Sequence, residues 1–118
     1  MRILVIDDDP LAGEMTAAII ESLGYATLLA SDAMEAMEQL DIHGDIGLIV
    51  SDHFMPLISG MELFHTLREQ GVILPFILLS GEDPHGRLDK TPGLTACLQK
   101  DADMENVLER TLRQALTP

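Results

Sequence analysis

Residues 46–60 read Ile-Gly-Leu-Ile-Val-Ser-Asp-His-Phe-Met-Pro-Leu-Ile-Ser-Gly and decide the fold. The apolar run Ile46–Val50 predicts a buried strand, which delivers one carboxylate, Asp52, into a turn. Pro56 prevents the strand from continuing, because proline has no N–H to donate to a sheet ladder. Ser59 then opens a helix. An acid at the tip of a buried strand is held rigidly and still reaches solvent, which suits a metal ligand or a phosphoryl acceptor.

Composition limits the classes of function. The chain has 118 residues and is 47% hydrophobic, so we expect a single domain over residues 1–118 with an aliphatic core. Its net charge of −13 would repel nucleic acid and anionic membranes, so we expect no direct contact with either. Cys97 is the only cysteine, which excludes an internal disulfide and fits a cytoplasmic location. We find no secretory signal and no apolar run near the ~20 residues of a membrane helix.

Short apolar runs alternate with amphipathic stretches along the whole chain. Strands are predicted at residues 2–6, 25–30, 46–50, 76–79 and 94–99. Each connection is long enough for a right-handed crossover between parallel strands, so the prediction is a three-layer α/β domain. Residues 82–93 have little apolar periodicity and predict a short or poorly formed helix.

Capping residues mark the helix starts. Asp9 before Pro10 predicts an N-cap, and Ser59 with Glu62 has the spacing of a capping box. Asp103 is expected to cap the last helix. Apolar spacing predicts that the first helix buries one stripe, made of Leu11, Met15, Ala18, Ile19 and Leu23.

Chemically active residues follow the predicted strands. In an open parallel sheet, functional groups collect beyond the carboxyl ends of the strands. The residues found there are Asp7, Asp8 and Asp9 after the first strand, Asp52 after the third, Ser80 after the fourth and Lys100 after the fifth. Asp9 is favoured as a helix cap rather than a metal ligand.

These residues make one coherent set. Clustered carboxylates raise one another's pKa unless a cation is present, and Mg²⁺ takes oxygen ligands of this kind. A metal-neutralised aspartate can act as a nucleophile on phosphorus and form an aspartyl-phosphate. Lys100 would then pair with the phosphoryl group, and Ser80 would donate a hydrogen bond to it.

Over its entire length the chain resembles the receiver domains of bacterial two-component response regulators. The matching residues are Asp7-Asp8, Asp52 with Met55-Pro56 and Gly60, Pro75 leading to Ser80, and Lys100. The resemblance implies a flavodoxin-like (βα)5 fold with strand order 2-1-3-4-5. It implies that Asp52 accepts phosphate from a sensor histidine kinase or phosphotransfer protein, and that Asp7, Asp8, Asp52 and the Phe54 carbonyl bind Mg²⁺. It also implies that Ser80 and Lys100 contact the phosphoryl group.

The chain departs from this family near its fifth strand. An aromatic residue usually stands three positions before the lysine and responds to phosphorylation together with the hydroxyl residue, here Ser80. That position is Cys97, so we predict an atypical switch. Proline with a cis bond usually follows the lysine, whereas Asp101 follows here. A cis bond before Asp101 would cost ~3–4 kcal/mol, so a trans bond is predicted.

Alternative functions remain open at this point. One is a degenerate receiver that serves only as a protein-interaction module without phosphorylation. Another is a Mg²⁺-dependent phosphohydrolase, although 118 residues leave little room for a substrate cap. The function that we favour is that of a phosphoacceptor domain, which dephosphorylates itself and does not turn over an external substrate. Its expected partners are a sensor histidine kinase or phosphotransfer protein, a downstream protein or a missing effector domain, and a second copy of the chain.

Overall fold

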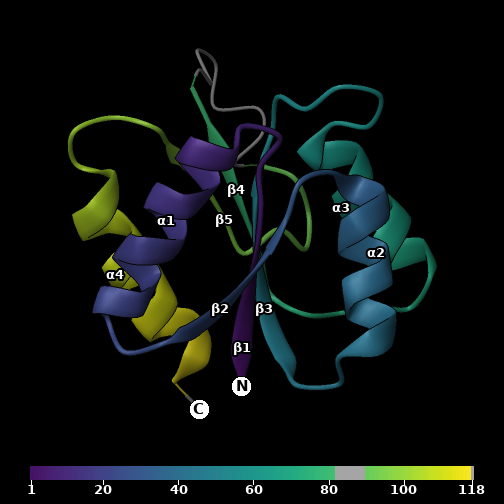
Figure 1. The fold of residues 1–118 in the computed structure, drawn as a ribbon, viewed down its shortest axis with the longest axis horizontal. Helices are drawn as coiled ribbons and strands as arrows, with labels where there is room; N and C mark the ends of the chain where they lie inside the picture. Colours follow the sequence, from purple (N-terminus) through teal and green to yellow (C-terminus); the bar gives the residue numbers. More distant parts are fainter. Residues whose placement is uncertain (82–89, 118) are drawn as a thin grey trace.

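Five parallel strands form a single sheet in a computed structural model, which describes residues 1–81 and 90–117 (Figure 1). The order across the sheet is β2-β1-β3-β4-β5, as the family resemblance implied. The carboxyl ends of the strands all point to the top of Figure 1. The strands are β1 (Arg2–Ile6), β2 (Ala26–Ala30), β3 (Ile46–Asp52), β4 (Phe76–Ser80) and β5 (Ala96–Gln99).

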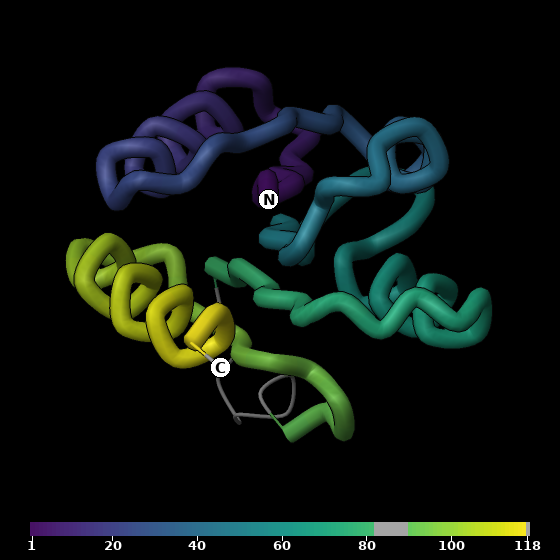
Figure 2. The backbone as a smooth tube through the Cα atoms, turned by 90° about the horizontal axis from the view of Figure 1, so that it is seen from below, coloured from purple at the N-terminus to yellow at the C-terminus, as the bar shows by residue number. Residues whose placement is uncertain are grey.

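Helices cover both faces of this sheet, as Figure 2 shows in the view from below. One face carries α1 and α4, and the other carries α2 and α3 (Figure 1). Within the described residues the helices are α1 (Pro10–Ser22), α2 (Ala33–Ile42), α3 (Gly60–Glu69) and α4 (Met104–Leu116). This is the predicted three-layer, flavodoxin-like arrangement. The helix predicted within residues 82–93 lies largely outside the described residues.

Each face of the sheet has its own core. One core packs strand residues such as Leu4 and Ile49 against Phe64 of α3, and the other packs Val5 and Val50 against Leu108 of α4. Alternate residues of β1 and β3 point to opposite faces, so both faces of these central strands are apolar. Since the interiors of these strands are largely apolar, the aspartates after β1 and at the end of β3 lie at the carboxyl edge of the sheet.

Local capping matches most of the predictions. The Asp9 carboxylate accepts hydrogen bonds from the Leu11 and Ala12 amides (3.0 and 3.5 Å) and starts α1. Ser59 and Glu62 form the predicted capping box at α3. Asp103 occupies the N-cap position of α4, but its side chain makes no capping hydrogen bond, so that part of the prediction was wrong.

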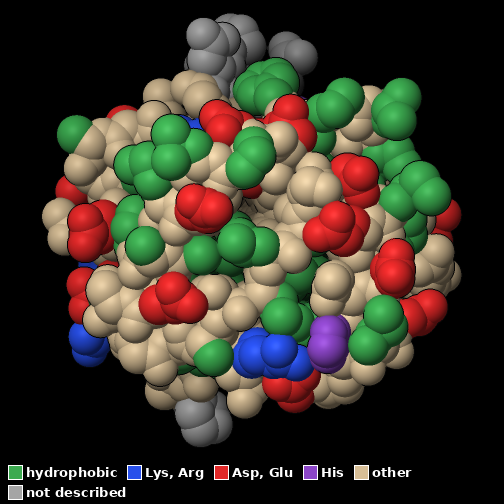
Figure 3. Space-filling model, viewed as in Figure 1, with side chains coloured by type: hydrophobic (Ala, Val, Ile, Leu, Met, Phe, Trp, Pro, Cys, Tyr) green, Lys and Arg blue, Asp and Glu red, His purple; other side chains and the backbone are tan. Residues whose placement is uncertain are grey.

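The predicted inner stripe of α1 was partly wrong. Leu11, Met15 and Ala18 are exposed, and the residues that face the sheet are Gly13, Thr16, Ala17 and Ile20. Small residues occupy this face because α1 lies very close to β1: a Cβ at Gly13 would lie 3.3 Å from Cβ of Asp7. The larger side chains therefore point outward, and hydrophobic side chains gather over α1 in Figure 3. The predictions for Ile19 and Leu23, both partly buried, were confirmed.

Among the described residues, no helix has the length and apolar character needed to cross a membrane.

Candidate functional site

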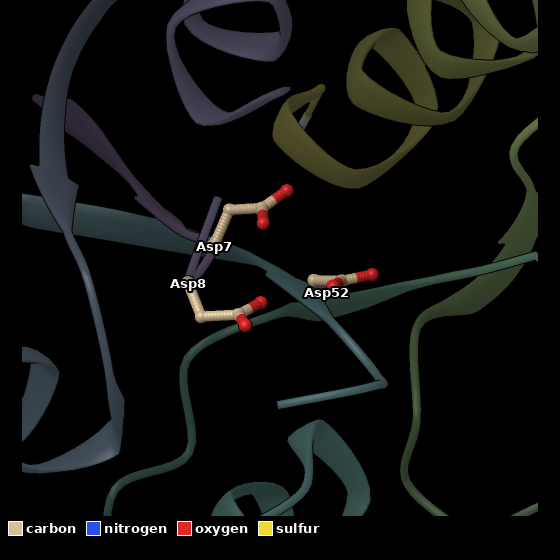
Figure 4. A group of neighbouring side chains, drawn as sticks. All are labelled: Asp7, Asp8 and Asp52. Carbon is tan, nitrogen blue, oxygen red and sulfur yellow. The ribbon is translucent and has the colours of Figure 1, made fainter. Parts of the chain in front are cut away.

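Three aspartates meet at the carboxyl edge of the sheet. Asp7 and Asp8 follow β1, and Asp52 is the last residue of the neighbouring strand β3. Each offers a carboxylate oxygen, and these oxygens all lie within 4.8 Å of one another. Figure 4 shows the three side chains turned toward a common space. Asp7 and Asp52 are buried, whereas Asp8 is exposed, so the cluster opens to solvent on one side.

The backbone around Asp7 and Asp52 fixes their positions. The amide of Asp9 donates to Oδ1 of Asp7 (2.9 Å), so the turn that caps α1 also orients this carboxylate. Asp52 pairs with Leu79 in the sheet, and the next amide, that of His53, donates to the Leu79 carbonyl (2.8 Å). Main-chain hydrogen bonds therefore hold both aspartates at the carboxyl edge of the sheet.

Lys100 brings a positive charge into the acidic cluster. Its ammonium nitrogen lies 2.8 Å from Oδ1 of Asp52 and 3.5 Å from Oδ2 of Asp7. Its backbone amide donates to the Ser80 carbonyl (2.9 Å), which ties the end of β5 to the end of β4. One lysine thus contacts two of the three carboxylates.

Burial dominates the electrostatics of this site. It raises the pKa of Asp52; the hydrogen bond from Lys100 lowers this pKa, and the charges of Asp7 and Asp8 raise it further. For Lys100, burial acts to lower the pKa, but the hydrogen bond and attraction to Asp52 prevail and raise it. The contact with Lys100 therefore does not offset the effect of burial on the Asp52 pKa.

The donor set fits a hard divalent cation. Carboxylate oxygens are the ligands that Mg²⁺ prefers, and it is commonly held by one or two carboxylates together with water and phosphate oxygens. Such an ion would stabilise the charged form of Asp52 and so lower its raised pKa. Asp7, Asp8 and Asp52 are the residues placed to hold it.

The remaining predicted site residues lie around this cluster. Ser80 is buried at the end of β4, beside the strand that carries Asp52. Phe54 lies two residues beyond Asp52 and is 61% exposed, and the role of its carbonyl as a metal ligand stays a prediction. Cys97 lies in β5 opposite Leu78 and is only partly buried. The trans bond predicted before Asp101 was confirmed, since the described residues contain no cis peptide bond.

Two contributions to the site were not predicted from the sequence. Gly60 packs against the backbone of the acid-bearing strand: an added Cβ would lie 2.3 Å from the Asp52 carbonyl oxygen. Directly after Lys100, the side chain of Asp101 closes a turn by accepting a hydrogen bond from the Asp103 amide. The spacing of Asp101 and Asp103 is compatible with such a turn, but short acidic stretches are common and the spacing alone did not single it out.

A doubly wound sheet with three clustered acids and a lysine at its carboxyl edge defines a receiver-type signalling domain. The pattern of the response regulator receiver domain matches residues 3–112. The chain therefore belongs to the response regulator receiver domain family.

Individual relatives agree with this assignment. The chain is 32% identical over 116 residues to the sensor histidine kinase RcsC of Escherichia coli, and this match covers 95% of the chain and 12% of that protein. It is 32% identical over 114 residues to the response regulator MprA of Mycobacterium avium, covering 93% of the chain and 49% of that protein. The chain thus spans between about an eighth and about half of these relatives.

Solved structures show the same fold. The response regulator TrrA of Thermotoga maritima, in complex with Mg²⁺ and BeF, superposes with a TM-score of 0.84 at 27% identity, with 98% of each chain covered. The chemotaxis protein CheY4 of Vibrio cholerae gives a TM-score of 0.83 at 28% identity, again with 98% of each chain covered.

Proposed function

We propose that this receiver domain accepts a phosphoryl group on Asp52 in Mg²⁺-dependent two-component signalling. The observation that carries the proposal is the contact of 2.8 Å between Lys100 and Asp52, inside a cluster that also contains Asp7 and Asp8. An ion pair with a purely structural role would need only Lys100 and Asp52. Phosphoryl transfer would use these two side chains together with Asp7 and Asp8.

Each side chain has a defined role in this proposal. An Oδ atom of Asp52 attacks phosphorus, and the phosphorus–nitrogen bond to a donor histidine breaks as the new phosphorus–oxygen bond forms. When bound, Mg²⁺ neutralises negative charge on the carboxylates and the transferring group. Asp7, Asp8, Asp52 and the Phe54 carbonyl would hold this ion. Lys100 and Ser80 would contact the new phosphoryl oxygens, which carry more charge than the original carboxylate.

The donor in this proposal is a sensor histidine kinase or a histidine phosphotransfer protein. Its support is that the relatives include both a sensor histidine kinase and a response regulator. The net charge of −13 favours protein partners over direct contact with nucleic acid or a membrane. A downstream protein, an attached effector domain and a second copy of the chain stay predictions, as does the cytoplasmic location.

We propose that the phosphorylation signal is read in an atypical way. Cys97 packs against the core that lies between the sheet and helices α2 and α3. By the family resemblance, an aromatic side chain is usual at this position. A cysteine side chain can rotate, but it displaces much less volume than an aromatic ring and so changes the neighbouring surface less. Adding beryllofluoride and Mg²⁺ should therefore shift the β5 amide resonances only slightly while Ser80 responds; large shifts throughout β5 would contradict this proposal.

The phosphoacceptor role is separated from its alternatives by three measurements on the same protein. Beryllofluoride with Mg²⁺ should bind wild type and fail to bind an Asp52→Asn variant. Slow loss of phosphate from isolated phosphoprotein would support self-dephosphorylation. Absence of beryllofluoride binding would instead favour an interaction module, and sustained turnover of small phosphate esters would favour a phosphohydrolase.

A further inference from the structure

The turn after β5 is closed by the side chain of Asp101. The amide of Asp103 donates to Oδ1 of Asp101 (2.9 Å), and the amide of Met104 donates to its carbonyl (3.1 Å). The amide of Asp101 itself donates to the Gln99 carbonyl (3.0 Å). Asp101 therefore takes part in three hydrogen bonds, one with Gln99 before it and two with Asp103 and Met104 after it, although Asp101 is exposed.

This turn connects Lys100 to the start of α4. Lys100 is the first residue after β5, and α4 begins at Met104. The Asp103 side chain does not cap α4, so Asp101 organises the backbone before the first turn of the helix. The Lys100 backbone is consequently held from both directions, by the Ser80 carbonyl on the sheet side and by the Asp101 turn on the helix side.

Holding the backbone matters because the lysine side chain is long and flexible. An unconstrained lysine loses considerable rotamer entropy when its ammonium group is fixed in one place. Here the ammonium group lies within 2.8 Å of Asp52 while the side chain is still 31% exposed. The limited burial leaves much of the positioning to the backbone from which the side chain starts.

We infer that Asp101 is a positioning residue for phosphoryl binding, acting through Lys100 by closing this turn with its side-chain oxygen. The inference rests on the proposed function, because it assigns Lys100 to the phosphoryl group. This positioning role depends on where the side-chain oxygen of residue 101 lies and not on the charge of that side chain. Asp101 takes no part in the acidic cluster, so its effect is confined to the phosphoryl side of the site.

Three substitutions separate geometry from charge. Asp101→Ala removes the side-chain acceptor, Asp101→Glu keeps the charge but places it one carbon further out, and Asp101→Asn keeps the acceptor without the charge. We expect apparent beryllofluoride affinity at saturating Mg²⁺ to fall about three- to tenfold for the Ala and Glu variants, the scale of one hydrogen bond. The Asn variant should retain the wild-type affinity. The affinity for Mg²⁺ alone should be unchanged in all three.

Asp103→Ala is the matched control, because it removes an equal charge two residues further along the chain. The Asp103 carboxylate accepts a hydrogen bond from the Asn106 side chain and does not cap α4. The Asp103→Ala variant should bind beryllofluoride as wild type does. Equal beryllofluoride affinities in wild type and Asp101→Ala would overturn the inference, as would a loss of beryllofluoride affinity in Asp101→Asn. An equally large loss of Mg²⁺ affinity in Asp101→Ala would also overturn it.

Amide hydrogen exchange gives a second readout that needs no ligand. Asp101→Ala and Asp101→Glu should speed exchange at the Lys100 and Asp103 amides, while Asp101→Asn should not. If wild type binds no beryllofluoride, the proposed function fails; unchanged exchange in Asp101→Ala would separately overturn the positioning role.

Discussion

The ammonium nitrogen of Lys100 lies 2.8 Å from Oδ1 of Asp52, across the carboxyl ends of β5 and β3, which are separated by β4. This contact joins the last strand of the sheet to the predicted phosphoacceptor. Burial raises the pKa of Asp52 despite the contact, so the charged form of this carboxyl is disfavoured in the free domain. This cost of the charged form leads to predictions on stability as well as on chemistry.

Asp52→Asn should increase the free energy of unfolding at neutral pH without Mg²⁺. Because the folded-state pKa of Asp52 is raised, its contribution to stability is greatest below the unfolded-state pKa and is lost as the pH rises through the folded-state pKa. A neutral amide avoids this loss, and the melting temperature should rise by roughly 2–6 °C. Thermal melts at pH 7 and pH 3 measure the difference in melting temperature between wild type and this variant. The difference should vanish at the lower pH, and a variant that melts below wild type at pH 7 would be contrary to the account.

Lys100→Met should lower the free energy of unfolding at pH 7 by roughly 1–2 kcal/mol, a value reduced from that of a fully buried pair because the lysine is partly exposed. The substitution leaves Asp52 and Asp7 without their cation. The loss of stability should shrink at acidic pH, because the carboxylates then take up protons. Urea titrations at both pH values check this. Lys90→Met is the control, since Lys90 is exposed and should change stability little. A pH-independent loss would argue against the electrostatic explanation.

Gly60→Ala should destabilise the domain by about 2 kcal/mol or more, because overpacking a rigid backbone contact is costly. The added methyl group would lie 2.3 Å from the Asp52 carbonyl oxygen and 2.7 Å from Cδ1 of Leu78. Gly44→Ala provides the comparison, since a Cβ there meets nothing within 4 Å. Chemical denaturation of both variants gives the answer, and similar small effects would show that the close approach at Gly60 can relax.

Leu57→Gly should raise the free energy of unfolding by about 0.5 kcal/mol. Leu57 has a φ of 69° in the left-handed region, and the residue is 99% exposed, so removing its side chain relieves strain without losing packing. The greater freedom of glycine in the unfolded chain offsets part of this gain. Leu57→Ala retains the Cβ and should remain near wild type. Calorimetry compares them, and a destabilised glycine variant would contradict the strain argument.

Long-range features of this fold were predictable because they depend on repeated patterns. Apolar runs such as Ile46–Val50 locate the strands, and each strand end then places its polar residue at one edge. That reasoning was enough to bring Asp7, Asp52 and Lys100 together. The resemblance to a family supplied the strand order.

Features that depend on close packing were not predictable. Apolar spacing suggested that Leu11 and Met15 face inward, but α1 approaches β1 through Gly13 and turns both side chains outward. Asp103 has the residue type of a cap, yet the preceding Asp101 closes the turn instead. In both places the outcome depends on distances between segments, which single-residue preferences do not contain.

The central claim is tested most directly by incubating the protein with acetyl phosphate and following its intact mass. Wild type should gain one phosphoryl group only when Mg²⁺ is present, and the modified residue should be Asp52. Asp52→Asn should gain none under the same conditions, while Gly44→Ala should react as wild type does. A wild type that remains unmodified with Mg²⁺, or an Asp52→Asn variant that is phosphorylated equally well, would contradict the assignment of Asp52 as the phosphoacceptor.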